Sequence, residues 1–155
     1  MSDLVACHRW SSFADLGRDE LYALLKLRAD VFVVEQRCAY ADIDGRDPDA
    51  RHLLVWTTGR EDLAGCLRVF APGSGTSDVR IGRVATAAFA RGRGLGRWMM
   101  SEALAESARR FGATGIELDA QVASEAFYGR LGFRRVSADF DEDGIMHCTM
   151  RFVCS

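Results

Sequence analysis

A glycine-rich turn joins a run of β-branched and small residues to an amphipathic segment within residues 84–100. Its glycines alternate with other residues: Gly92, Gly94 and Gly96. Glycine permits positive φ and close backbone approach, so successive amides can point into one concavity beside the unpaired N–H groups at the start of a helix. Three arginines add positive charge to the same turn: Arg91, Arg93 and Arg97. The turn therefore predicts a site for a ligand that carries several phosphates.

The spacing of these glycines excludes the better-known phosphate loops. A Walker A loop ends in Gly-Lys-Ser/Thr, whereas Gly96 is followed by Arg97 and Trp98. The dinucleotide fingerprint requires Gly-x-Gly-x-x-Gly, which the alternating glycines do not form. A disordered RNA-binding tract would repeat its Arg-Gly units and would not open a helix. The pattern that remains is Arg-x-x-Gly-x-Gly, at Arg91, Gly94 and Gly96.

The composition indicates a folded protein. The chain of 155 residues is 48% hydrophobic and 27% charged, which predicts a single domain over residues 1–155. Its net charge of −2 lacks the basic excess of dedicated nucleic-acid binders, so we expect no nucleic-acid partner. Purely aliphatic and aromatic runs, such as residues 31–34, are far shorter than the ~18 residues of a membrane span. Since no apolar leader follows Met1, we expect a cytoplasmic protein with no membrane partner.

The cysteines indicate reduced thiols. Their number is odd, with no C-x-x-C pair among them: Cys7, Cys38, Cys66, Cys148 and Cys154. A zinc site that combines Cys38 with His52 and scattered acids would lack the short paired spacing of zinc ligands. We therefore expect no metal site.

Hydrophobic periodicity predicts an α/β domain with a mixed sheet and helices on its faces. The expected strands are residues 4–10, 52–57, 63–71, 79–86, 115–121, 133–136 and 146–153. The expected helices are residues 18–35, the segment between the glycine turn and Gly112, and residues 124–131. The second to fourth strands form an antiparallel meander, and the crossover helix makes strands 79–86 and 115–121 the one parallel pair. The last two strands form a hairpin across the acidic loop 139–144.

The first helix and the loop after it carry unusual charges. Residues 31–34 are apolar all round, which predicts burial on more than one side. Arg28 and Glu35 lie two turns apart on one face, either in a network of salt bridges or on the wall of a substrate cleft. The loop after this helix contains four acids: Asp42, Asp44, Asp47 and Asp49. We expect solvated surface there, with attraction of a cationic substrate as the alternative.

The order of elements resembles that of the GCN5-related N-acetyltransferases, the GNAT family, over nearly the whole chain. Two motifs in register carry the resemblance. The first is Arg-x-x-Gly-x-Gly, and the second is the segment Tyr-x-x-x-Gly-Phe at Tyr128, Gly132 and Phe133. Smaller segments at residues 27–36, 42–45, 81–84 and 143–147 are similar to the ElaA-like branch of that family.

The resemblance implies a GNAT-type acyl-CoA N-acyltransferase fold and acetyl-CoA as co-substrate. The backbone near Val84 would pair with the pantetheine arm like an added strand, because that arm offers amide donors and acceptors as a peptide does. The cofactor-binding residues that it implies are Val84, Ala85, Thr86, Arg91, Gly92, Arg93, Gly94, Leu95, Gly96, Arg97, Gln121 and Tyr128. At Gln121 many relatives carry Asn, so this chain departs from the family pattern there.

Acetyl transfer to an amine requires proton handling at two places. In this setting Tyr128 is the candidate general acid that protonates the departing thiolate. The general base is open among four side chains: Glu35, Glu117, His52 and His147. Candidate substrate-binding residues are Arg28, Asp44, His52, Arg68 and Arg83. For Arg68 and Arg83, pairing with Glu35 or Asp44 is the simpler interpretation.

The leading hypothesis is an acetyl-CoA-dependent N-acetyltransferase that acts by direct attack in a ternary complex. Its acceptor would be a primary amine of a small molecule or peptide. A noncatalytic acyl-CoA sensor is the alternative, and a nucleotide-phosphate binder is a third. A homodimer is allowed by these observations but not required by them.

Overall fold

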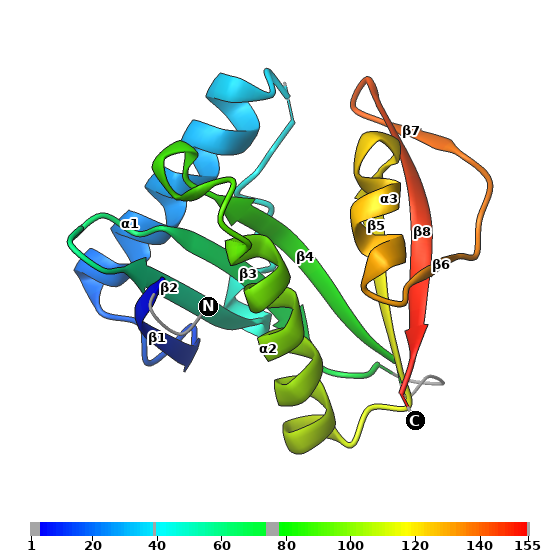
Figure 1. The fold of residues 1–155 in the computed structure, drawn as a ribbon, viewed down its shortest axis with the longest axis horizontal. Coiled ribbons are helices and arrows are strands. Elements are labelled where there is room, and N and C mark those ends of the chain that lie inside the picture. The colour runs from blue at the N-terminus through cyan, green and yellow to red at the C-terminus, as the bar shows by residue number, and fades with distance from the viewer. Residues whose placement is uncertain (1–3, 39, 74–77, 155) are drawn as a thin grey trace.

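The computed structural model describes residues 4–38, 40–73 and 78–154. Its centre is an eight-stranded mixed sheet in the order β1-β2-β3-β4-β5-β8-β6, with β7 paired to β8 (Figure 1). The strands are β1 Val5–Ser12, β2 Arg51–Thr57, β3 Gly65–Phe70, β4 Asp78–Thr86, β5 Gly115–Gln121, β6 Arg134–Arg135, β7 Phe140–Glu142 and β8 Ile145–Val153. The helices are α1 Arg18–Arg28, α2 Leu95–Phe111 and α3 Glu125–Arg130, with a π-helix η1 at Ala29–Glu35. Short 3₁₀ turns are η2 Asp47–Asp49, η3 Ala88–Ala90 and η4 Val122–Ser124.

The predicted sheet topology is confirmed. Strands β2, β3 and β4 form the antiparallel meander, and β4 and β5 are parallel across the α2 crossover. Two details at the C-terminal end differ. Within the predicted strand 133–136 only Arg134–Arg135 pairs with β8, and three residues of the predicted acidic loop form strand β7. The start of that loop is a strand, since Phe140–Glu142 pairs antiparallel with residues 145–147 of β8 and Phe140 faces His147. The predicted turn between β3 and β4 falls partly at residues 74–77, outside the described residues.

The helix predicted at residues 18–35 is present, but it changes form after Arg28. Its last seven residues are π-helical, and only Val31 and Phe32 of the apolar run are buried. Val33 and Val34 are 44% and 67% exposed, so the prediction that the run is buried on more than one side is wrong. A π-helix advances fewer degrees per residue than an α-helix, so the apolar run does not keep one face toward the sheet.

Helices α1 and α2 cover opposite faces of the sheet. Neighbouring residues of a strand point to opposite faces. Accordingly Leu53 and Val55 of β2 belong to the core cluster under α2, together with Met99 and Ala103. Leu54 instead belongs to the cluster under α1, together with Leu24, Leu27, Phe32 and Cys66. The two helices thereby hold β2, β3 and β4 as one rigid half of the molecule.

Strands β4 and β5 pair over a short length and then diverge (Figure 1). Their register covers three residues on each strand, from Asp78–Arg80 opposite Gly115–Glu117. On its other side β4 contains a bulge, since Cys66 faces Ala85 while Arg68 faces Gly82. Arg83 occupies the bulge with φ of 51°. A bulge increases local twist and bends the strand. β4 is therefore bent and more strongly twisted in the part of the strand that no longer pairs with β5.

The loop between η1 and β2 is fixed by buried ion pairs. Arg28 is 1% exposed, and its Nε lies 3.1 Å from Asp42 Oδ2 while its Nη1 lies 2.7 Å from Asp47 Oδ1. Arg68 contacts Asp44 at 2.6 Å and Asp47 at 2.9 Å. Hydrogen bonds from Arg68 hold the pKa of Asp44 well below its usual range. The prediction of a solvated acidic loop is therefore wrong for Asp42 and Asp47, which are buried, whereas Asp44 lies at the surface while it pairs with Arg68.

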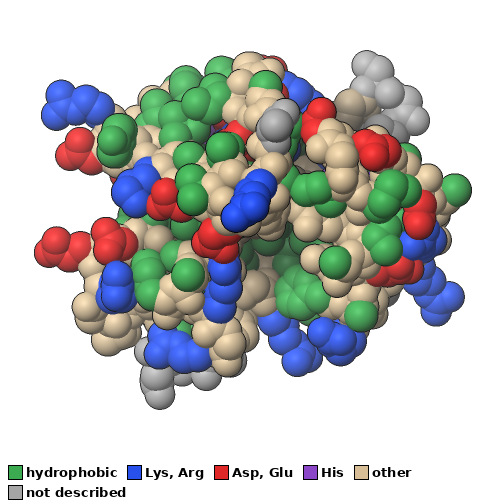
Figure 2. Space-filling model, turned by 90° about the horizontal axis from the view of Figure 1, so that it is seen from above, with side chains coloured by type: hydrophobic (Ala, Val, Ile, Leu, Met, Phe, Trp, Pro, Cys, Tyr) green, Lys and Arg blue, Asp and Glu red, His purple; other side chains and the backbone are tan. Residues whose placement is uncertain are grey.

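The outer surface has a mixed charge. On the face shown in Figure 2, Lys and Arg side chains are interspersed with Asp and Glu side chains rather than gathered by sign. No helix in the part of the chain that the structure describes combines the length and apolar character needed to span a bilayer.

Replacing Arg28 with Met should lower the free energy of unfolding by about 3–5 kcal/mol, because it leaves Asp42 and Asp47 buried with less compensating charge. Urea unfolding followed by circular dichroism measures this change. Lys26→Met is the matched control, since Lys26 forms an exposed pair with Asp30 and its loss should cost less than about 0.5 kcal/mol. Equal effects of the two substitutions would contradict the stabilising role of the buried pairs.

Candidate active site

The divergence of β4 and β5 opens two cavities. The first has a volume of about 300 Å³ and lies between β4 and β5. Its walls come from β3, from the β7–β8 turn and from Gln36, Cys38, Tyr40, Asp44 and Arg46. The second has a volume of about 340 Å³ and lies between the glycine turn, the start of α2 and α3. Three residues line both cavities: Val84, Ser124 and Tyr128. A molecule bound in one cavity therefore meets a molecule bound in the other beside Tyr128.

The glycine turn presents free amides to the second cavity. Gly92 and Gly94 have φ of 78° and 83°, and Gly94 is the N-cap of α2. No side chain caps this helix, and its first hydrogen bond runs from the Trp98 amide to the Gly94 carbonyl oxygen. The amides before Trp98 are therefore free of helical partners. Such a terminus is suited to bind an anion.

Two of the arginines in this turn are placed differently from the prediction. Arg91 lines the second cavity, but its guanidinium also lies 2.7 Å from Glu35 and donates to the Thr86 carbonyl oxygen at 2.8 Å. Arg97 lines the cavity, whereas Arg93 does not. Glu35 lines neither cavity. The carboxylate of Glu35 is paired with Arg91, so its placement does not favour the predicted role as a general base, which stays a prediction.

Tyr128 lies on α3 between two aromatic rings. Its ring centroid is 5.0 Å from that of Phe127 and 6.0 Å from that of Phe133, both in edge-to-face geometry. Burial raises the pKa of the Tyr128 phenol to about 12. At neutral pH the hydroxyl is therefore protonated and can donate. Tyr128 lines both cavities, and its role as a general acid stays a prediction.

His147 of β8 lines the first cavity, and its contacts fix the ring. Its Nδ1 lies 2.8 Å from the Ile145 carbonyl oxygen, and the ring stacks on Phe140. A nitrogen that faces a carbonyl oxygen carries the proton in the neutral ring, which leaves the lone pair on Nε2. That nitrogen lies 3.5 Å from Glu142 Oε2. His147 is thus the one predicted base whose ring borders the cavity.

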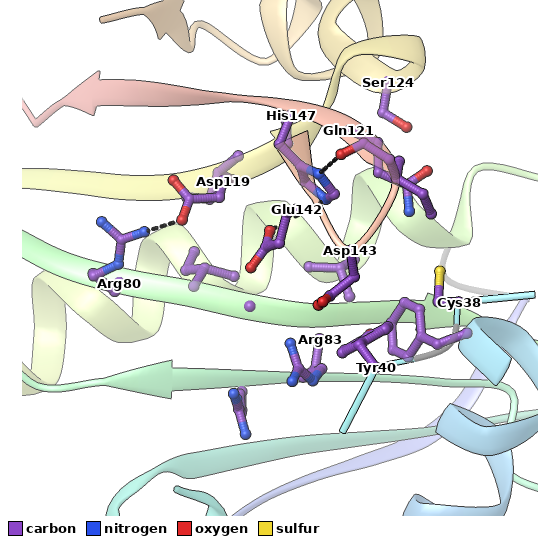
Figure 3. Close-up of a pocket in the computed structure, with 18 of the residues that line it drawn as sticks. Cys38, Tyr40, Arg80, Arg83, Asp119, Gln121, Ser124, Glu142, Asp143 and His147 are labelled. Atoms are coloured by element: carbon purple, nitrogen blue, oxygen red, sulfur yellow. Dashed lines mark hydrogen bonds and ion pairs between the residues drawn. The ribbon is translucent and has the colours of Figure 1, made fainter. Parts of the chain in front are cut away.

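Glu117 lies outside the first cavity, and its carboxylate is held by Arg80 at 3.0 Å. Arg80 also binds Asp119 at 2.8 Å, the contact drawn in Figure 3. This arginine therefore bridges two acids of β5 at the point where β4 and β5 separate. The role of Glu117 as a base stays a prediction that this placement does not favour, because its carboxylate is paired at the closed end.

Two predicted substrate-binding residues are buried away from the cavities. His52 is fully buried, and its Nε2 lies 2.9 Å from the Asp47 carbonyl oxygen. Burial lowers the pKa of the His52 imidazole, so its ring is neutral at neutral pH. Arg28 is equally buried in the ion pairs described above. Both residues contact the loop at 42–47 and line neither cavity, so their placement does not favour the predicted roles of His52 as a base and of both as substrate ligands.

The other predicted substrate residues line the first cavity: Asp44, Arg68 and Arg83. They are largely occupied with one another, as the pairing hypothesis expects. Arg83 Nε lies 2.9 Å from Asp42 Oδ1, and its Nη2 lies 3.4 Å from Asp44. The Arg83 guanidinium also lies 5.0 Å from the ring centroid of Tyr40. These side chains form a wall of fixed charge beside β4.

Of the three β4 residues that were predicted to hold the pantetheine arm, two lie at the cavities. Val84 lines both and Thr86 lines the second, whereas Ala85 is buried against β3 and lines neither. Gln121 lines the first cavity, and its Nε2 donates to Gln36 Oε1 at 2.8 Å. This hydrogen bond joins the end of η1 to the end of β5 across the opening.

Several lining residues were missed by the sequence analysis: Gln36, Tyr40, Arg46, Asp119, Glu142 and Asp143. Glu142 and Asp143 belong to the acidic loop, whose charge was evident. What the sequence did not reveal is that Phe140 pairs with His147 and so brings these acids beside the histidine. Among the described residues, no group of three or more His, Cys, Asp or Glu side chains could hold a metal ion.

Comparison with known proteins agrees with this geometry. The family model for the acetyltransferase (GNAT) domain matches residues 22–154. ElaA from Escherichia coli is 38% identical over 139 residues, covering 88% of this chain and 90% of ElaA. The crystal structure of E. coli ElaA superposes with a TM-score of 0.86 at 34% identity, covering 96% of this chain and 99% of that chain.

Two further solved structures share the fold. An acyl-CoA N-acyltransferase from Pseudomonas aeruginosa has a TM-score of 0.87 at 42% identity, covering 95% of this chain and 99% of that chain. A Bacillus subtilis acetyltransferase in complex with CoA has a TM-score of 0.66 at 17% identity, covering 96% and 98%, and this likeness concerns the fold alone. The chain therefore belongs to the GNAT family of acetyltransferases, as an ElaA-like member.

Proposed function

We propose that this protein transfers an acetyl group from acetyl-CoA to a primary amine of a small molecule or peptide, by direct attack in a ternary complex. The observation that carries the proposal is the junction of the two cavities at Val84, Ser124 and Tyr128. One cavity presents free amides, and the other presents a histidine and carboxylates. The similarity to a protein named acyl-CoA N-acyltransferase supports the same reaction class.

The second cavity fits the diphosphate of CoA. The amides between Gly92 and Trp98 would bind its oxygens, and the exposed Arg97 adds positive charge at the rim. The unpaired edge of β4 beyond Arg80 would accept the pantetheine amides by strand addition. Bound there, acetyl-CoA supplies an activated thioester beside Tyr128.

Two side chains would move the protons. His147 Nε2 would accept the proton of the acceptor's ammonium, because His147 lines the first cavity and its Nδ1 is engaged by the Ile145 carbonyl oxygen, while Glu142 beside Nε2 would stabilise the imidazolium that forms. The freed amine nitrogen then attacks the thioester carbonyl carbon. Tyr128 would donate its proton to the sulfur as the carbon–sulfur bond breaks, and the proton that the attacking nitrogen loses as the amide forms would restore the phenol. No residue of the chain needs to carry the acetyl group.

Gly92→Ala should weaken CoA binding about tenfold, because positive φ strains an alanine and shifts the turn that offers the amides. Isothermal titration calorimetry with CoA measures the change. Gly59→Ala is the matched control: Gly59 has φ of +81°, a similarly open environment and a place in another turn, so its variant should bind CoA normally. A wild-type protein that binds ATP but not CoA would instead indicate a nucleotide-phosphate binder.

Tyr128→Phe should lower kcat about a hundredfold while the affinity for CoA stays unchanged, because the phenol acts only as the thiolate departs. Thiol release from acetyl-CoA measures kcat. Since the pKa of this phenol is about 12, loss of its proton should not reduce the wild-type rate below about pH 10. A protein that binds CoA but gives no turnover to be slowed would be a sensor rather than an enzyme.

His147→Gln should lower kcat/KM at neutral pH about a hundredfold, with partial recovery at alkaline pH where the acceptor amine is already deprotonated. A pH–rate profile distinguishes this from a structural effect, which alkaline pH would not repair. His8→Gln is the control, because His8 lies on β1 beside Glu102 and away from both cavities. An unchanged profile in His147→Gln would exclude His147 as the base.

A further inference from the structure

Most charges around the first cavity are already matched by a neighbour. Arg68 is paired with Asp44, and Arg80 is paired with Asp119. The Arg83 guanidinium is held by a carboxylate from the loop beneath it. These pairs leave little net charge for a substrate to neutralise. The charged side chains that have no ion-pair partner in the cavity wall therefore decide which charged substrate the cavity can hold.

Two carboxylates on one wall lack an arginine or lysine partner. Figure 3 shows Glu142 and Asp143 beside His147 on the β7–β8 hairpin, facing the side chain of Arg83 on β4. Glu142 has the His147 ring 3.5 Å away. Within the described residues, no arginine or lysine lies within ion-pair distance of either carboxylate. This wall can therefore stabilise a positive charge beside the histidine.

One guanidinium on the opposite wall also lacks a carboxylate partner. Arg46 lines the cavity and stacks over the ring of Phe70 at 4.2 Å, and its own backbone amide donates to Asp44 Oδ1 at 3.0 Å. None of the ion pairs among the described residues involves its guanidinium. Stacking leaves the in-plane N–H groups of an arginine free to bind a carboxylate.

The negative and positive groups lie toward opposite ends of the cavity. Phe70, beneath Arg46, pairs with Arg80 at the closed end, where β4 and β5 still meet. Val84 and Tyr128 mark the other end, where the acetyl group must be received. Arg80 and Val84 are four residues apart along β4, which corresponds to about 13 Å at ~3.3 Å per residue. An acceptor that uses both ends is therefore extended.

We propose that the acceptor is an ω-amino carboxylate, a primary amine joined by several methylene groups to a carboxylate. This inference rests on the proposed function and specifies its substrate class. The ammonium end lies beside Glu142, Asp143 and His147, next to Tyr128. The carboxylate end lies on Arg46 at the closed end. An α-amino acid carries its two charges on adjacent groups and is too short to satisfy both ends.

A chain-length series tests the inference. Thiol release from acetyl-CoA is measured with glycine, β-alanine, γ-aminobutyrate, ε-aminohexanoate and ω-aminooctanoate, and with alkylamines of matched length. The kcat/KM should rise from glycine toward the longer members and should exceed that of the matched alkylamine about tenfold or more, as expected for a charge-assisted hydrogen bond. Nα-acetyllysine and its amide show whether the same chemistry is accepted at the end of a peptide.

Arg46→Gln assigns the carboxylate subsite. It should lower kcat/KM for ε-aminohexanoate about tenfold and leave that for hexylamine unchanged. Arg60→Gln is the matched control, because Arg60 stacks over Phe89 at 3.9 Å outside the cavity and its variant should behave as wild type. Calorimetry with CoA on each variant verifies that the co-substrate site is intact.

The outcomes separate the two levels of the proposal. Equal kcat/KM for aminocarboxylates and alkylamines, or an equal loss of both in Arg46→Gln, would overturn the substrate class while acetyl transfer stands. If the protein binds CoA but acetylates none of these amines, the proposed substrate class is overturned as well. Failure of the wild-type protein to bind CoA would instead remove the proposed function on which the inference rests.

Discussion

The constraint on which the site depends is the early end of pairing between β4 and β5. Three residues on each strand are in register, and beyond Arg80 no strand in the described part of the chain pairs with the facing edges. Unpaired main-chain groups inside a sheet need another source of hydrogen bonds. Arg80 bridges Glu117 and Asp119 at the point of separation, so the fork has a fixed position. Both cavities lie beside this separation of β4 and β5, and Tyr128 lies where the two cavities meet.

The wall on the β4 side has a different physical basis. It is a loop without regular periodicity, and it is held by guanidinium groups from α1, β3 and β4 against three carboxylates. Such buried pairs contribute little net stability when complete, but breaking one is costly. The network therefore specifies one conformation of the loop more than it strengthens the fold. That conformation places Tyr40 and Arg46 at the cavity.

Features that depend on neighbouring residues could be predicted from the sequence. The glycine turn, the parallel crossover and the helix that carries Tyr128 follow from turn chemistry and hydrophobic period. Pairing of Arg68 and Arg83 with Asp44 was among the expectations, but most other partners of charged groups could not be predicted, because Arg28 meets acids 14 and 19 positions away and Glu35 meets Arg91 56 positions away. Several arginines and acids compete for each such pairing, and only the folded chain selects among them. For the same reason three of the four candidate bases proved to lie outside the cavities.

The hydrogen bond between Gln36 and Gln121 has a consequence for how the opening responds to solution conditions. Both partners are uncharged amides, so neither protonation nor dissolved salt acts on their contact directly. The groups inside the cavity are mostly ionic and do respond to both. We therefore expect this contact to be less sensitive to pH and salt than the ion pairs inside the cavity. Acidification or added electrolyte should change which charged molecules the cavity attracts before it breaks the hydrogen bond between Gln36 and Gln121.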